Sequence, residues 1–504
     1  MSIIGSDHDQ PDARAASDSA TTPTPAPSRV IRPLVMRLHF YAGLFIAPFL
    51  IVAAVSGGLY AIAPTAEQWV YRDLVHTDSS GPTAPLTDQI RVAQRVEPDL
   101  DVAAVRPAAE PGQTTRVMFT DPALGSSERM AVFVDPVTAR SQGEDVVYGS
   151  SGSLPMRTWV SQLHRNLHLG EPGRIYSELA ASWLWVIALG GLALWVIRYR
   201  TLKRNTGSAS LLGVDRATTG RARTLNWHGA VGAWIVVGLV FLSATGLTWS
   251  RFAGENIGEL RQSLSWTTPQ MSTSLSPDAG ESSPAGHQGH GAADDPVPAD
   301  DQTLTRNVDE AGSVLSIARA AGVTGAVELS LPSDPGTAMV VSQVRTPWQL
   351  ETNSVAIDPA SGSIVDESTF SEWPLAAKLT SWGIALHMGL LFGLANQLVL
   401  LAIAIGLVSL GVRGYIMWWK RRPTRRRQGL GFPTAPRRGA LRRIHPAAAL
   451  AVFIGAMLVG WFVPLLGLSV LAFVLVDVLI GLCRRGGRRT MTPSTSADTT
   501  SKGA

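Results

Sequence analysis

Long runs of apolar residues, separated by ordinary polar sequence, are the feature that most constrains this chain. A helix needs roughly 20 apolar residues to cross the hydrocarbon core of a bilayer, and four segments meet this requirement: 40–63, 179–197, 230–249 and 395–418. A fifth apolar block, 447–482, is too long for one crossing and contains Pro464, so we interpret it as a hairpin of two short spans. We therefore expect a polytopic α-helical membrane protein with about six spans.

Lysine and arginine cluster in the short segments that flank these spans. They precede the first span, lie between the second and third, follow the fourth, and close the last. Because such residues stay on the cytoplasmic side of a membrane, the pattern predicts an inner-membrane, multi-pass protein with both termini in the cytoplasm. Each cluster abuts a span, so topology explains the clusters better than nucleic-acid binding, and no nucleic-acid partner is expected.

The two long loops would then lie outside the cytoplasm, and each is predicted to contain a small α+β domain. The first has a helix at 86–96 followed by four short strand-like runs, and the second repeats this order after a helix at 308–320. An Asp-Pro pair, at Asp135 in one loop and Asp358 in the other, is typical of a tight turn between strands. Two such domains are therefore expected on one side of the membrane.

This pattern predicts the following organisation of the whole chain. Residues 1–28 lack a basic start and an apolar core, so they are expected to be a disordered cytoplasmic tail rather than a removable signal peptide. In residue numbers, the remaining parts are a first span (29–63), a first outer domain (64–163), an outer histidine segment with the second span (164–200), a cytoplasmic loop (201–224), a third span (225–249), a flexible linker (250–302), a second outer domain (303–380), an outer histidine segment with the fourth span (381–419), a basic cytoplasmic loop (420–445), the apolar hairpin (446–483) and a cytoplasmic tail (484–504).

The spans also contain an internal duplication. The first and third share histidine, glycine, small hydroxyl and glycine at identical spacing: His39, Gly43, Ser56 and Gly57 in one, His228, Gly232, Thr245 and Gly246 in the other. Five turns of about 3.6 residues separate the histidine from the last glycine, so Gly57 shares a helix face with His39 and Gly246 shares one with His228. The second helix of each half repeats as well, with His164 and Gly191 matching His387 and Gly414.

The duplicated histidines point to haem. In the predicted topology His39 and His228 lie toward the cytoplasm, whereas His164 and His387 lie toward the other face. Two imidazoles from facing helices are the axial ligands of a b-type haem, and a neighbouring glycine lets the flat macrocycle approach the backbone. We therefore predict two b-type haems, one near each face. The predicted cofactor-binding residues are His39, His228, His164, His387, Gly43, Gly232, Gly57 and Gly246.

Histidines in or near membrane spans can also have roles other than haem ligation. One interfacial histidine alone more often contacts lipid headgroups or a neighbouring helix, and it is the duplicated pairs that favour haem. A divalent-metal transport site would need carboxylates in the spans, where only Asp477 is available. The single cysteine, Cys483, excludes an intramolecular disulfide and a four-cysteine iron–sulfur site.

Four further histidines give weaker signals. His168, one turn after His164, could assist as an additional ligand, although its counterpart in the second half is a leucine. His445 begins the hairpin among arginines and is interpreted as structural. His287 and His290 could hold a metal loosely, but in a flexible linker a solvated role is favoured. No metal site beyond the haem iron is therefore expected.

Taken together, these segments resemble the PepSY-associated transmembrane family, whose members are sometimes described as iron-regulated membrane proteins. The resemblance covers about residues 30–425. It rests on the Leu-His-x-x-Leu-x-x-Gly segments at Leu163 and Leu386, the basic ending at 418–423 and the two Asp-Pro turns. It implies PepSY-type α+β domains outside the membrane and, for some members, a haem-containing ferric-siderophore reductase. The hairpin after 443 is an addition to the family pattern.

The expected function is electron transfer across the bilayer through two haems to an acceptor outside the cytoplasm. The favoured acceptor is ferric iron in a siderophore or another oxidised metal, which would make the chain a haem-dependent reductase linked to iron uptake. No strand followed by Gly-x-Gly-x-x-Gly opens a soluble helix, so the donor is expected to be separate, a quinol or a reduced flavin. The alternative is a non-enzymatic, membrane-anchored protein whose PepSY domains bind or regulate a peptidase or an envelope partner.

Overall fold

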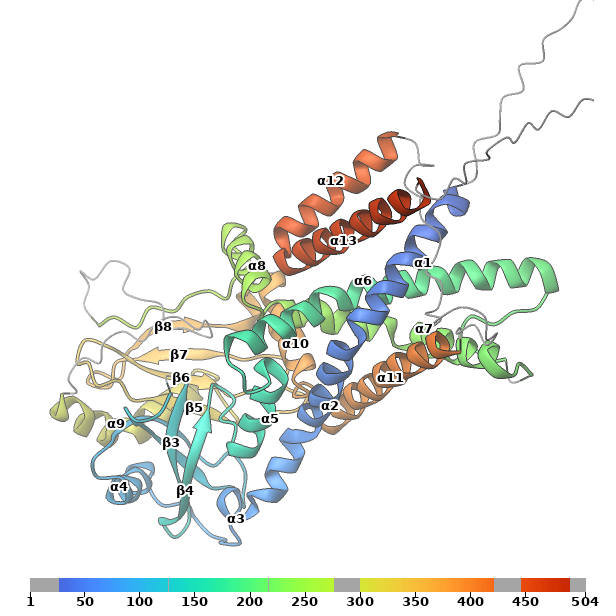
Figure 1. The fold of residues 1–504 in the computed structure, drawn as a ribbon. Coiled ribbons are helices and arrows are strands. Elements are labelled where there is room, and N and C mark those ends of the chain that lie inside the picture. The colour runs from blue at the N-terminus through green and yellow to red at the C-terminus, as the bar shows by residue number, and fades with distance from the viewer. Residues whose placement is uncertain (1–26, 126, 216, 276–299, 421–445, 490–504) are drawn as a thin grey trace, which may run out of the picture.

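The chain folds into a bundle of long helices at one end and a β-sheet at the other, as the computed structural model in Figure 1 shows. The structure describes residues 27–125, 127–215, 217–275, 300–420 and 446–489. Most of the expected N-terminal tail, the part of the linker with His287 and His290, the basic segment with His445, and the end of the C-terminal tail lie outside these residues. The predictions made for those parts are not addressed by the fold.

Helices α2, α6, α7 and α11 are long and apolar enough to cross a membrane. They pack as a ring in which α1 and α2 together form one of the four members. In that ring α11 contacts α2 and α7, while α6 contacts α1 and α7. The helices of this bundle and of its connections are α1 (Pro27–Phe45), α2 (Ala47–Val70), α3 (Arg72–Val75), α5 (Pro155–Asn166), α6 (Glu171–Thr206), α7 (Gly220–Leu247), α8 (Phe252–Ser263), α10 (Leu375–His387) and α11 (Gly393–Trp419).

The first expected span, 40–63, is divided between α1 and α2 by a turn at Ile46. Pro48 follows this turn and has no backbone N–H to donate to the carbonyl of Leu44, four residues earlier. The hydroxyl of Tyr415, on α11, donates to that carbonyl instead at 2.8 Å. The break in the helix is therefore stabilised from the neighbouring helix.

The C-terminal apolar block forms two helices, α12 (Pro446–Phe462) and α13 (Pro464–Arg489), which lie side by side next to α1 and α6 (Figure 1). Their apolar stretches, Ala449–Phe462 and Pro464–Ile480, are shorter than the four helices of the bundle. The Trp183 indole donates to Ser469 at 2.8 Å, and Arg37 pairs with Asp477. The helices of the hairpin thus separate before Pro464, as the sequence predicts, while the crossing of a bilayer by each of them stays a prediction.

The two long loops form four strands each and join into one antiparallel sheet of eight strands, in the order β4-β3-β2-β1-β5-β6-β7-β8. The junction pairs Ala104 with Ser330 and Val105 with Leu329. The strands are β1 (Asp101–Arg106), β2 (Thr115–Thr120), β3 (Glu128–Asp135), β4 (Arg140–Tyr148), β5 (Val327–Ser330), β6 (Met339–Gln343), β7 (Ser354–Ile357) and β8 (Ile364–Ser368), and a short 3-10 helix, η1 (Phe370–Glu372), follows them.

One face of this sheet carries helices α4 (Leu86–Val96) and α9 (Asp301–Ala320), and the core beneath them is shared by both halves of the chain. Alternation along the strands explains the core, because successive side chains point to opposite faces. Phe119 faces α4 and α9, whereas Met118 and Phe133 face the start of α5. Arg91 on α4 pairs with Asp309 on α9. The two expected domains are therefore two units of one continuous structure.

Both Asp-Pro turns form as the sequence predicts. Asp135 accepts hydrogen bonds from the amides of Val137 and Thr138 at 2.9 and 3.3 Å, and Asp358 accepts from the amide of Ala360 at 2.9 Å. Each turn follows a β-bulge at the matching place in its unit. The duplication thus extends from the helices into the turns of the sheet.

Candidate functional site

Two of the predicted ligands, His39 on α1 and His228 on α7, lie next to each other at the end of the bundle away from the sheet. Their ring centroids are 6.3 Å apart and their planes are nearly perpendicular, at 79°. The Nδ1 atom of His39 lies 3.1 Å from the carbonyl of Ile187, and that of His228 lies 3.2 Å from the carbonyl of Leu410. We call His39 and His228 the loop-side pair.

The other two predicted ligands, His164 on α5 and His387 on α10, lie at the end of the bundle next to the sheet, and we call them the sheet-side pair. Their Nδ1 atoms contact side-chain hydroxyls: Ser56 Oγ at 3.0 Å and Thr245 Oγ1 at 2.6 Å. Both rings are half-buried. Burial lowers the pKa of His387, and the nearby His164 lowers it further. Burial lowers the pKa of His164 as well, so both imidazoles are favoured in the neutral form that ligates a metal.

Glycines make room for three of the four rings. A Cβ atom at Gly57 would lie 2.9 Å from Cε1 of His164, and one at Gly191 would lie 2.9 Å from Cε1 of His39. A Cβ atom at Gly246 would lie 3.7 Å from Cε1 of His387. Each ring therefore lies against bare backbone on a neighbouring helix, and a side chain at Gly57 or Gly191 would move it.

The remaining predicted glycines lie elsewhere. Nothing lies within 4 Å of a Cβ atom built at Gly43, and one at Gly232 would meet only the side chain of Leu410, at 3.8 Å. Gly57 contacts His164 rather than His39, the histidine of the same predicted span. The sequence pattern placed Gly57 on the same helix face as His39. In the structure α5 packs on α2, so the ring that Gly57 contacts is that of His164.

One tautomer satisfies the hydrogen bonds of all four imidazoles. A carbonyl oxygen only accepts, so His39 and His228 donate from Nδ1. The hydroxyl of Ser56 lies 2.9 Å from the carbonyl of Val52, and that of Thr245 lies 2.8 Å from that of Phe241. With its one proton given to the helix carbonyl, each hydroxyl can accept a hydrogen bond from Nδ1 of the sheet-side histidine beside it. Every Nε2 then carries a lone pair that can bind a metal.

Ser56, Thr245 and the carbonyls of Ile187 and Leu410 are the functional groups that were not assigned from the sequence. The hydroxyls were visible in the repeat, one residue before Gly57 and Gly246, but their partners are on other helices. The carbonyls belong to residues one turn before the matched glycines of α6 and α11. A backbone acceptor leaves no trace in residue identity, so only the three-dimensional structure finds it.

His168 does not join the sheet-side pair. His168 is exposed, and its ring centroid lies 4.9 Å from that of Trp159. Its backbone adopts a positive φ of 56° after the end of α5. The ring centroids of Trp249 and His387, by contrast, lie 5.4 Å apart, with the two planes nearly perpendicular. The described surroundings of the sheet-side pair are thus hydroxyl and aromatic groups.

The two halves hold their sheet-side histidines differently. Glu67, near the end of α2 next to the sheet, accepts from the amide of Leu154 at 2.8 Å and pairs with Arg157 at 3.2 Å. Both side chains are buried, at 2% and 7% exposure. The matching positions in the second half are Asn256 and Thr380, and Asn256 donates to the carbonyl of Phe462 at the hairpin, at 3.0 Å. A buried ion pair therefore fixes α5 on α2, and no such pair links the matching residues.

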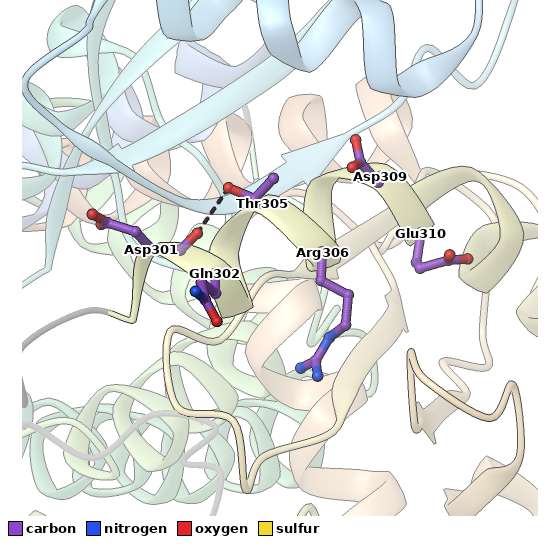
Figure 2. Close-up of a pocket in the computed structure, with 6 residues that line it drawn as sticks. All are labelled: Asp301, Gln302, Thr305, Arg306, Asp309 and Glu310. Atoms are coloured by element: carbon purple, nitrogen blue, oxygen red, sulfur yellow. Dashed lines mark hydrogen bonds between the residues drawn. The ribbon is translucent and has the colours of Figure 1, made fainter.

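The hollow along α9 lies apart from the histidines. The hollow of about 490 Å³ along α9 is lined by Asp301, Gln302, Thr305, Arg306, Asp309 and Glu310. Figure 2 shows these side chains spreading from one helix in different directions, with Arg306 and Asp309 on opposite sides. Among the residues that the structure describes, no three His, Cys, Asp or Glu side chains gather as a divalent-metal site requires. The paired imidazoles are therefore the strongest candidate site.

The fold and the site define a class: a multi-pass, internally duplicated membrane protein with paired histidines at both ends of its bundle. The comparison with known families names that class. Residues 36–421 match the family described as PepSY-associated TM region. The match covers well over half of the chain, so the chain belongs to this family, and the resemblance seen in the sequence is confirmed. No curated protein matches the chain.

Proposed function

We propose that this protein carries electrons across a membrane through two b-type haems, one at each histidine pair. The observation that carries the proposal is that four imidazoles lie in two pairs, each pair joining one histidine from each half, with Nδ1 of every ring beside a hydrogen-bond acceptor. Gly57 and Gly191 add the open backbone that a flat macrocycle needs for close approach. The residues present therefore fit bis-histidine haem, which when bound supplies a one-electron carrier.

The chain's own groups have three roles in this proposal. The helices hold the imidazoles in pairs, so that two ligands reach one centre from opposite sides. The acceptors at Nδ1 fix each ring's orientation and leave Nε2 as the ligand. The apolar bundle excludes water between the pairs, which keeps charge on the two centres. His39 and His228 would hold the loop-side haem, and His164 and His387 the sheet-side haem.

The direction of transfer follows from the proposed topology. Basic residues flank the loop-side ends of the helices, which supports an inner-membrane protein of six spans with both termini and the loop-side pair toward the cytoplasm. The sheet, formed by two PepSY-type units, would then lie outside, next to the sheet-side pair. The acceptor would dock there, and a ferric siderophore or another oxidised metal suits that place. A quinol or reduced flavin would supply electrons.

The spectrum of the purified full-length protein tests the proposal. We expect a reduced b-type absorption band whose intensity falls by about half in His39→Ala and in His387→Ala, because each variant removes one ligand pair. His168→Ala is the matched control and should keep the full band. A folded, colourless wild-type protein would refute the proposal and favour a purely binding or regulatory role for the sheet.

A further inference from the structure

The two histidine pairs differ in the group that accepts the Nδ1 proton. In the loop-side pair the acceptors are backbone carbonyls, and in the sheet-side pair they are the hydroxyls of Ser56 and Thr245. Each kind of acceptor occurs once in each half, at matching positions. The two pairs therefore differ in the acceptor at Nδ1, and both halves show the same difference.

We propose that Ser56 and Thr245 are positioning residues that give the sheet-side haem a higher reduction potential than the loop-side haem. The inference rests on the proposed function and adds to it the reason why electrons move toward the sheet. It concerns this chain's own hydroxyls, which act on the metal through His164 and His387.

The first step of the argument is the orientation of the hydroxyls. Each hydroxyl lies within 3.0 Å of a carbonyl four residues earlier in its own helix and within 3.0 Å of an imidazole Nδ1. The carbonyl of Ala53 also faces the His164 ring. With its only proton bonded to the helix, the hydroxyl oxygen remains as an acceptor for the imidazole. Ser56 and Thr245 thus hold the rings against Gly57 and Gly246.

The second step is the strength of the acceptor. A strong acceptor at Nδ1 makes an imidazole a more basic ligand, and a more basic ligand stabilises the ferric state and lowers the potential. An amide carbonyl is a stronger acceptor than a hydroxyl, so the loop-side rings are the more basic. Electrons that enter at the loop side are therefore passed to a centre that holds them more tightly.

A purely structural role for the hydroxyls has to be separated from this one. Serine and threonine in helices often bond to the preceding turn with no further partner. Ser182 is such a residue, since its hydroxyl donates to the carbonyl of Glu178 at 2.7 Å. Ser182 is on α6 and is fully buried. It therefore provides a matched control for the loss of a helix-bonded hydroxyl.

The test is a potentiometric titration of the haem-loaded, full-length protein. Thr245→Val, alone and combined with Ser56→Ala, should move the sheet-side transition to a more positive potential, because the His387 ring loses its Nδ1 acceptor. Ser56→Ala alone should move it less, because the Ala53 carbonyl remains beside the His164 ring. The loss at Thr245 should amount to roughly a tenfold change in the reduction equilibrium, about 59 mV for a one-electron couple. The loop-side transition should not move. The transition that disappears in His387→Ala identifies the sheet-side centre.

The controls separate the possible results. Ser56→Thr and Thr245→Ser keep a hydroxyl and should retain the wild-type potentials, and Ser182→Ala should do the same. Haem-loaded variants with unmoved potentials, or an equal shift in Ser182→Ala, would overturn this inference and leave the proposed function intact. A single variant suffices for this comparison, and its loop-side transition reports that the protein is folded and loaded. A wild-type protein without haem would overturn both proposals.

Discussion

The first and second halves of this protein have the same histidine chemistry in different surroundings. In each half a hydroxyl and a glycine of one helix contact a histidine that precedes the next long helix. Around this common centre the first half has the buried pair of Glu67 and Arg157, whereas the second has Asn256 and Thr380. The contrast teaches that the contacts of the imidazole are independent of the way in which its helix is fixed.

The largest expected difference between the halves is in stability. Glu67→Ala leaves the Arg157 guanidinium buried without its carboxylate, and we expect it to lower the free energy of unfolding by about 3–5 kcal/mol. Asn256→Ala removes a hydrogen bond to the hairpin and should cost about 1 kcal/mol. Denaturant unfolding in detergent, followed by tryptophan fluorescence, measures both. Equal losses would show that the ion pair is not what distinguishes the halves.

A smaller difference is expected at the glycines. Gly57→Ala places a methyl group where only 2.9 Å separates it from the His164 ring, while the corresponding distance for Gly246→Ala is 3.7 Å, an ordinary contact. We expect Gly57→Ala to cost about 1–3 kcal/mol and Gly246→Ala less than about 1 kcal/mol. The same unfolding assay compares them, and haem content shows whether His164 has moved. A larger loss from Gly246→Ala would contradict the packing described for the two rings.

The smallest expected difference concerns the two Asp-Pro turns. Desolvation raises the pKa of Asp135, but hydrogen bonds from Ser79, Thr138 and the amides of Val137 and Thr138 outweigh it and lower the pKa to about 2. This carboxylate therefore stabilises the fold above about pH 4, and the contribution is lost as the pH falls toward 2. Fewer hydrogen bonds, chiefly that from Ser361, lower the pKa of Asp358.

Asparagine substitutions compare these turns. Asp135→Asn should remove up to about 2 kcal/mol of stability at neutral pH and flatten the decline between pH 4 and pH 2. Asp358→Asn should have a smaller effect in the same direction. Unfolding curves measured across this pH range give both values. A pH profile that Asp135→Asn leaves unchanged would show that another group causes the acid sensitivity of the sheet.

Local sequence patterns predicted most elements of this fold. The helix expected at 86–96 has those bounds in the structure, and the strands and both Asp-Pro turns lie where alternation and turn residues placed them. The pairing of β1 with β5 was not predicted, because it joins segments more than 200 residues apart. The break at Ile46 was also missed, since the Tyr415 hydroxyl that stabilises it comes from another helix.

For the candidate site too, the sequence predicted the residues but not their contacts. Repeated spacing identified the four histidines and the glycines at 57 and 246, because a duplication displays its shared residues in the sequence. Helical periodicity gives the face of a residue and not its neighbour, so the contact of Gly57 with His164 had to come from packing. The acceptors of the Nδ1 protons depend on packing too, and two of them are backbone atoms.

The number of haem groups per chain tests the central claim most directly. Full-length wild-type protein, purified from membranes with haem in ample supply, should contain two b-type haems per chain, and the variant with His39, His228, His164 and His387 all changed to alanine should contain none. A folded wild-type protein without haem, or a quadruple variant that still holds haem, would contradict the assignment of these four imidazoles as ligands.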